Sequence, residues 1–192
     1  MKIDYNKLMK QEISSFGGKP KLLLHCCCAP CSSAVIERLK EFFDITFFYF
    51  NPNTYPESEY DLRASEFEKL GVKIVKVEYN HEEFLNLIKG KEQDVEGGDR
   101  CKICIAFRMD KTFTYAVENN FEVVTTTLSI SPHKDAEFIN TIGESFEKKY
   151  GIKYLHADFK KENGYLRSIQ ICKDLGIYRQ DYCGCEFSNS QK

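Results

Sequence analysis

The chain has 192 residues, of which 42% are apolar and 29% are charged, as in an ordinary globular domain with a sizeable core. With 27 Lys and Arg against 29 Asp and Glu, its net charge of −2 argues neither for nor against nucleic-acid binding, so such binding would need a local basic patch. No stretch is long and apolar enough for a signal peptide or a membrane span. We therefore expect a cytoplasmic protein whose thiols stay reduced.

Strand-like and helix-like segments alternate along the chain. Short apolar or β-branched runs predict strands at residues 21–25, 45–50, 72–78, 122–128 and 152–156. Helical spacing of apolar residues predicts helices at residues 31–43, 58–70, 81–89, 101–119, 135–150 and 163–175. Residues 176–192 show no clear periodicity. Strands that alternate with helices imply right-handed crossovers and a parallel sheet, hence an α/β fold.

Chemically distinctive residues follow two of the predicted strands. Residues 26–28 come directly after the first strand, and residues 129–133 follow a later one. Because ligands of parallel α/β sheets bind outside the carboxyl ends of the strands, we expect both segments at the functional edge.

Nine cysteines are the main chemical feature of this chain, and most of them lie in three groups that are far apart in sequence. The groups are Cys26-Cys27-Cys28 with Cys31 close behind, Cys101 with Cys104, and Cys183 with Cys185. So many clustered thiols in a reduced protein favour a metal or iron–sulfur centre over a disulfide scaffold, and an odd number fits poorly with complete pairing.

The first group lies where the first strand passes into a helix. Pro30 suits the first helical turn, and Ser32 or Ser33 would cap or begin the helix. Free N–H groups at the helix start then face the thiols and favour thiolates or an anionic cluster. A phosphate could use the same geometry, but phosphate loops carry glycines where this loop carries cysteines. A buried strand end with small apolar side chains is the other alternative.

The second group, Cys101-x-x-Cys104, lies at a predicted junction of loop and helix. Its spacing allows two thiolates to bind one metal or one cluster, but it does not distinguish a zinc site from an iron–sulfur site or a redox dithiol. Arg100 and Arg108 flank it. They either neutralise a cluster or bind an anionic substrate, or they are solvated surface residues.

The third group, Cys183-Gly-Cys185, can share a metal, close a small and easily reduced disulfide, or form a flexible tail with spare thiols. Cys172 stands alone in a helical segment and is expected to pack in the core. Cys31 either binds the metal or supports the metal site without binding it, and we expect the latter.

Other residues have two interpretations each. His25 either orients a thiolate or simply ends the first strand. Asp135 either caps a helix or acts at the functional edge. Basic residues around Tyr165, including Arg167 and Arg179, either hold a nucleic-acid strand or are solvated residues at the start of a helix.

Five segments taken together resemble the cobalamin-independent epoxyqueuosine reductase family (QueH). They are HCCCAPCSS (25–33), NPN-x-YP-x-x-EY-x-x-R (51–63), EGGDRCKICIAFRM (96–109), TTTLSISPHKD (125–135) and GYLRS…YRQDYCGCEFS (164–188). The resemblance spans about residues 20–188. It implies a Rossmann-like three-layer domain, with a central mostly parallel sheet and helices on both faces. Residues 21–192 would form this single catalytic domain, and residues 1–20 a variable N-terminal extension.

The resemblance also implies an activity and a cofactor. Members of the family reduce the epoxide of epoxyqueuosine in tRNA to queuosine, the last step of queuosine biosynthesis. They use a [4Fe–4S] cluster and no cobalamin. Carried over by motif, the cluster ligands would be Cys26, Cys27, Cys101 and Cys104, with Cys28 as the alternative to Cys26. Cys183 and Cys185 would form a redox-active disulfide pair or bind a second, mononuclear iron.

The reaction needs two electrons and two protons, and a cluster supplies one electron at a time. We expect Cys183 and Cys185, or a second iron, to complete the electron pair, and Asp135 or Tyr182 to protonate the departing oxygen. No flavin or nicotinamide fingerprint is present, so electrons should come from an external low-potential carrier that is ferredoxin- or flavodoxin-like.

The partner would be the tRNA anticodon loop, whose bases can be splayed out and stacked on aromatic side chains. The residues expected to contact the substrate are Arg108, Lys134, Tyr165, Arg167 and Arg179. Two other functions stay open. An ATP-dependent tRNA-thiolation enzyme would need a Gly- and Ser-rich pyrophosphate loop where this chain has cysteines, and a zinc or metal-binding protein would need no enzymatic activity.

Overall fold

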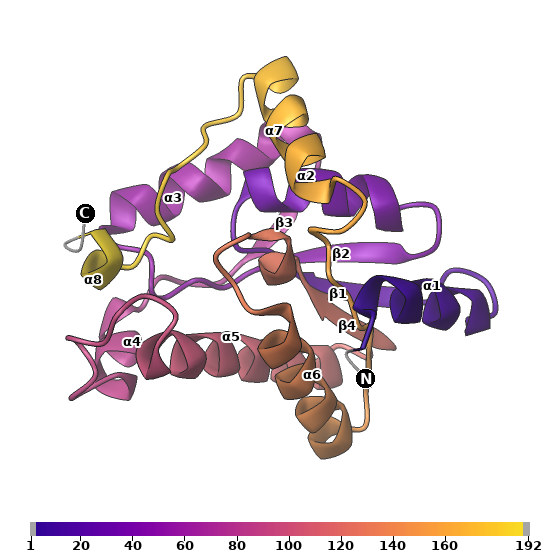
Figure 1. Cartoon of the computed structure of the whole chain (residues 1–192), viewed down its shortest axis with the longest axis horizontal. Coiled ribbons are helices and arrows are strands. Elements are labelled where there is room, and N and C mark those ends of the chain that lie inside the picture. Colours follow the sequence, from indigo (N-terminus) through magenta and orange to yellow (C-terminus); the bar gives the residue numbers. More distant parts are fainter. Residues whose placement is uncertain (1–2, 190–192) are drawn as a thin grey trace.

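A central sheet of five parallel strands organises the chain, whose computed structural model describes residues 3–189 (Figure 1). The strands are β1 (Lys21–His25), β2 (Asp44–Tyr49), β3 (Ile74–Lys76), β4 (Val123–Thr126) and β5 (Lys153–Tyr154). They pair in the order β3-β2-β1-β4-β5, and helices cover both faces. The expected Rossmann-like three-layer α/β architecture is therefore confirmed.

The α-helices of residues 3–189 are α1 (Tyr5–Ser15), α2 (Ala29–Leu39), α3 (Glu57–Ser65), α4 (His81–Leu87), α5 (Asp99–Glu118), α6 (Ala136–Tyr150), α7 (Gly164–Leu175) and α8 (Glu186–Asn189). Two 3-10 helices, η1 (Glu66–Leu70) and η2 (Thr127–Ile130), follow α3 and β4. Within this described part of the chain, no helix combines the length and the apolar character needed to cross a bilayer.

The central strand β1 is apolar on both sides because both faces of the sheet are covered. Leu22 and Leu24 point into a core shared with α1, α2 and α7, whereas Leu23 points into a core shared with α5 and α6. All three side chains are fully buried. A continuous apolar run is what a central strand of a parallel sheet requires, and it places the end of β1 in the middle of the functional edge.

Several boundaries differ from the sequence expectation. The expected Ser cap is wrong, because α2 already begins at Ala29 with Cys28 as its N-cap residue, and the Ser32 hydroxyl donates to the Cys28 carbonyl at 2.8 Å. The edge strands β3 and β5 are shorter than predicted, since each pairs on one side only. The C-terminal segment, for which no element was expected, ends in the short helix α8.

Helix α1 lies in the predicted N-terminal extension, whose residues 1–2 are outside the described part of the chain, and it packs onto the sheet. Met9 is buried in the core with β1 and α2. Glu12 bonds the backbone and the ring of His156 at 3.0 and 2.8 Å, and the other ring nitrogen of His156 contacts Glu144 at 3.0 Å. These contacts fix α1 to the segment after β5.

The contact between Glu12 and His156 has a defined pH dependence. Burial opposes both charges, but their mutual hydrogen bonds outweigh it, lowering the pKa of Glu12 below 4.5 and raising the pKa of His156 above 6.5. The stabilisation from Glu12 is lost as pH falls through its folded pKa, and that from His156 is lost as pH rises through its folded pKa. The pair therefore stabilises the fold most between pH 4.5 and 6.5.

We predict that Glu12→Gln lowers the free energy of unfolding by about 1–3 kcal/mol in this window, because it removes one charge of a mostly buried pair. The penalty should shrink above the folded pKa of His156. Urea unfolding at several pH values measures it, and the exposed Glu41→Gln is the control, with an expected change within about 0.5 kcal/mol. A penalty that is constant from acid to alkaline pH would contradict the prediction.

Candidate metal centre

The site lies where β1, β2 and β4 end at one edge of the sheet. The strand order changes direction between β1 and β4, which is the position where parallel α/β sheets bind ligands. His25, the last residue of β1, contacts the Thr126 hydroxyl at 2.8 Å and the Phe50 carbonyl at 3.2 Å. It thus ties the three strand ends together, and burial, with the nearby Arg108, lowers its pKa to about 3, so that the ring is neutral.

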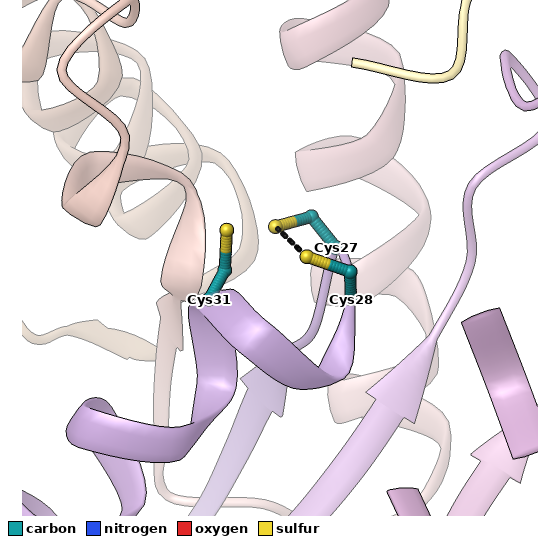
Figure 2. A group of neighbouring side chains, drawn as sticks. All are labelled: Cys27, Cys28 and Cys31. Atoms are coloured by element: carbon teal, nitrogen blue, oxygen red, sulfur yellow. Dashed lines mark hydrogen bonds between the residues drawn. The ribbon is translucent and has the colours of Figure 1, made fainter. Parts of the chain in front are cut away.

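Three thiols converge at the start of α2 (Figure 2). The sulfurs of Cys27, Cys28 and Cys31 all lie within 4.8 Å of one another, and those of Cys27 and Cys28 are 3.9 Å apart. Cys28 precedes the first helical residue and Cys31 is three residues further on, so the two face the same side of the first turn. Cys31 is therefore a full member of the thiol group, a more direct place than the supporting role expected for it.

This group favours one thiolate among the three. Hydrogen bonds from the thiols of Cys28 and Cys31, with help from the charge of Arg108, hold the pKa of Cys27 well below its usual range. The hydrogen bond that the Cys28 thiol makes to Cys27 raises the pKa of Cys28 to about 12. The Thr127 hydroxyl donates to the Cys27 sulfur at 3.4 Å. A thiolate at a helix N-terminus is a ready ligand for a soft metal.

Cys26 lies apart from this group. Its side chain is fully buried in the core with Leu22 and Leu24, and its thiol donates to the Leu24 carbonyl at 3.3 Å. Burial raises the pKa of this thiol far above its ordinary value. The alternation of side chains along the extended chain thus turns Cys26 towards α2 and α7, whereas Cys27 packs with the opposite core.

The ammonium group of Lys134 interacts electrostatically with a cysteine from each of the three groups. Burial opposes its charge, but Cys183, Cys27 and Cys104 outweigh burial and raise the pKa of the ammonium group. Together with Cys101, Lys134 also lines a cavity of about 130 Å³ beside α5 and the start of α6. The structure therefore brings together at one edge thiols that are more than 150 positions apart in sequence.

The third cysteine group forms a turn that packs against Cys104 of the second group. Cys185 is buried against Cys104 and Phe84, and its backbone N–H donates to the Cys183 sulfur at 3.5 Å. A hydrogen bond from the Cys185 thiol and the charge of Lys134 hold the pKa of Cys183 well below its usual range. The turn thus presents a second thiolate beside its partner thiol, which suits either metal binding or thiol–disulfide exchange.

Three buried arginines lie in segments that carry or contact the cysteines. Arg63, Arg100 and Arg108 are at most 4% exposed, so the interpretation of Arg100 and Arg108 as solvated surface residues is wrong. Arg108 donates to the side chain of Asn51, which in turn donates to the Cys26 carbonyl at 3.0 Å. Each of the three guanidinium groups keeps at least one buried N–H without a hydrogen-bond partner.

These donors test whether a metal group fits. A buried cation with unused N–H groups is costly unless negative charge lies close by. Several thiolates that bind a soft metal would supply such charge, and sulfur is the ligand that zinc and iron–sulfur clusters prefer. The residues present therefore fit a thiolate-bound metal group.

The candidate proton donors lie at the rim. Asp135 caps α6, with its Oδ1 accepting from the N–H groups of Glu137 and Phe138 at 2.9 and 3.4 Å, and it also lines the 130 Å³ cavity. Both interpretations of Asp135 are thus compatible with its position. The Tyr182 ring lies 5.0 Å from the Arg63 guanidinium.

The residues expected to hold nucleic acid have partners on and around α7. The Arg179 guanidinium lies 5.1 Å from the centre of the Tyr165 ring, and Arg167 makes two bonds to Glu37 at 2.9 and 2.7 Å. Cys172, on α7, is buried in the core, as expected.

Sequence reasoning did not single out several of these residues. Thr127 and Asn51 contact the backbone of Cys27 and Cys26 from the ends of β4 and β2, and Arg63 contacts the Cys183 carbonyl from α3. Their only signal was their presence in the segments NPN-x-YP-x-x-EY-x-x-R and TTTLSISPHKD, because a single hydroxyl, amide or guanidinium has no spacing pattern of its own.

Comparison with known proteins agrees with this geometry. The family model described as epoxyqueuosine reductase QueH matches residues 22–191. The chain belongs to this family. A QueH protein from Streptococcus pyogenes serotype M1, named epoxyqueuosine reductase, is 42% identical over 97% of this chain and 78% of its own length. Proteins of the same name from Staphylococcus epidermidis and Thermotoga maritima are 39% and 37% identical, over 97% and 87% of this chain and 85% and 89% of their own lengths.

The separation of Cys26 from the thiol group gives a direct prediction. Anaerobically isolated Cys28→Ala protein should lose most of its bound metal, because one of the three converging sulfurs is removed. Cys26→Ala should keep it, as should Cys172→Ala, which removes another buried thiol away from the site. Metal analysis of the three variants measures this. Loss of metal in Cys26→Ala with retention in Cys28→Ala would reverse the assignment.

Proposed function

We propose that this protein is an epoxyqueuosine reductase that reduces the epoxide of epoxyqueuosine in tRNA to the alkene of queuosine. The observation that carries the proposal is the convergence of Cys27, Cys28 and Cys31 at the sheet edge, in electrostatic reach of Lys134, in a chain of the QueH family. As an enzyme of tRNA maturation, it would work in the cytoplasm.

The reaction fixes what the site must supply. Conversion of an epoxide to an alkene breaks both C–O bonds and consumes two electrons and two protons, and the oxygen leaves as water. Oxidation of the Cys183 and Cys185 thiols to a disulfide releases two electrons and two protons, so the balance closes. The lowered pKa of Cys183, caused by the Cys185 thiol and by Lys134, supports this role. The alternative is that these two sulfurs bind a second, mononuclear iron.

We further propose that the metal group is a [4Fe–4S] cluster, which would transfer electrons one at a time when bound. Cys27, Cys101 and Cys104 would hold it, with Cys28 as the fourth ligand. The motif assigned the fourth position to Cys26 or Cys28. The position of Cys26 in the core supports Cys28. Arg108 and Lys134 would offset the negative charge of the site.

The small cavity is our candidate for the place of the epoxide-bearing ring. Its 130 Å³ are lined by Cys101, Lys134 and Asp135 among others, which puts a thiol, a cation and a carboxyl group around one space. Lys134 would hold the epoxide oxygen, and Asp135 or the Tyr182 hydroxyl would donate its proton. Arg108 is buried, so its charge would act on the substrate without direct exposure to solvent.

The anticodon loop of the tRNA would cover this edge. Single-stranded loops offer unstacked bases, and Tyr165 with Arg179 forms a stacked pair of the kind that holds such bases. Arg167 would contact the backbone after leaving Glu37. Re-reduction of the Cys183–Cys185 disulfide needs an external low-potential carrier of the ferredoxin or flavodoxin type.

The two other functions can be separated from this one. A tRNA-thiolation enzyme binds pyrophosphate after the first strand, where this chain places Cys27 and Cys28. A zinc protein is colourless, whereas anaerobically isolated protein with an iron–sulfur cluster is brown. Iron and sulfide analysis together with a reductase assay on epoxyqueuosine-containing tRNA tests the proposal, and a colourless, inactive protein would refute it.

We predict that Cys183→Ser keeps the iron content of the wild type but abolishes turnover, because a hydroxyl cannot form a disulfide. Iron analysis of the variant, next to the tRNA assay with a low-potential chemical reductant, measures both. Cys172→Ser is the matched control and should turn over normally. Normal activity of Cys183→Ser would rule out the role proposed for this thiol.

A further inference from the structure

One buried residue of the site has no role in the function proposed above. Arg63 lies in the last turn of α3 and is 2% exposed. Its Nε donates to Glu59 at 2.7 Å, and its Nη1 donates to the Cys183 carbonyl at 3.0 Å. With the Tyr182 ring against its plane, the guanidinium is held on three sides.

Gly184 shows how closely this side chain approaches the cysteine turn. Its φ of +101° lies in the region that only glycine adopts readily, and a Cβ there would lie 2.7 Å from Arg63 Nη1 and 3.1 Å from Thr54 Oγ1. The Gly184 carbonyl also accepts the Tyr55 N–H at 2.9 Å. Because Arg63 is anchored by Glu59 and Tyr182, it cannot move aside freely, so the residue between the two cysteines has to be glycine.

The guanidinium of Arg63 stays charged although it is buried. Burial opposes the charge, but neighbouring groups, Cys28 and Glu59 among them, raise the pKa of Arg63. Its Nη2 is buried and has no hydrogen-bond partner. One side chain thus contacts the turn of the third cysteine group and keeps one buried donor unused.

We propose that Arg63 is a positioning residue that holds the Cys183–Gly184–Cys185 turn against α3. A planar cation with several donors suits this place, because one N–H binds the turn while another binds Glu59. The role of the two thiols in turnover rests on the proposed function, but the position of the turn does not.

Two variants disturb the contact from opposite sides. Arg63→Lys removes the planar group, and Gly184→Ala adds the Cβ that Arg63 excludes. Gly151→Ala is the matched control, since Gly151 also has a positive φ, +72°, but has no atom within 4 Å of the added Cβ and lies at the end of α6. The measurement is the alkylation rate of each thiol in the folded, anaerobically reduced protein, with the buried Cys172 as internal reference.

We expect the alkylation rates of Cys183 and Cys185 to rise about tenfold or more in both variants, because the turn loses its anchor. The rate of Cys172 should change less than about twofold, and Gly151→Ala should resemble the wild type in all three thiols. On epoxyqueuosine-containing tRNA, kcat should fall about 100-fold while KM stays within about threefold, since the thiols are misplaced without loss of substrate contacts.

Unchanged alkylation of the turn thiols in both variants would overturn the proposal. So would a parallel rise for Cys172, because Arg63 would then stabilise the whole fold and not the turn. If the wild-type protein has no reductase activity, the proposed function fails, whereas the alkylation rates still decide the role of Arg63.

Discussion

Buried sulfur anions need buried positive charge, and this requirement organises the functional edge of the protein. Arg108 from α5 and Lys134 from the segment after η2 both act on Cys27, and Arg63 from α3 binds the Cys183 carbonyl. Hydrogen bonds from neighbouring thiols and the charges of Arg108 and Lys134 together favour the thiolates of Cys27 and Cys183. These thiolates in turn offset the cost of burying the charge of Lys134.

The sheet brings these charges together by its strand order. Connections run outward from β1 to β3 on one side and from β4 to β5 on the other, so the chain leaves β1 and β4 in different directions. The gap between these two strand ends is where Cys27 and Thr127 meet. The chemistry therefore depends on topology, and the all-parallel pairing is what makes distant motifs neighbours.

The sequence predicts much of this architecture, because hydrophobic periodicity reports burial directly. The apolar run of β1 and the helical spacing of α5 and α6 lead to the correct elements. The exact members of the thiol group depend on a detail that periodicity does not contain. Helix α2 begins at Ala29 and not near Cys31, so Cys31 lies within the first helical turn. Its sulfur then points to the same side as those of Cys27 and Cys28. Lone residues such as Thr127 and Arg63 become visible only when the pairing of strands and helices is known.

The third cysteine group is attached differently from the other two. Residues 177–185 form neither helix nor strand, and single contacts such as Tyr178 N–H to Glu66 and His81 to Glu186 hold the segment and its flanks to the body of the domain. No strand pairing holds this segment, so its local opening would break side-chain and single backbone contacts, those of Arg63 and Tyr55 included, and would leave the sheet intact. The thiols of Cys183 and Cys185 would then move, whereas those of Cys27, Cys28 and Cys31 would stay at the start of α2.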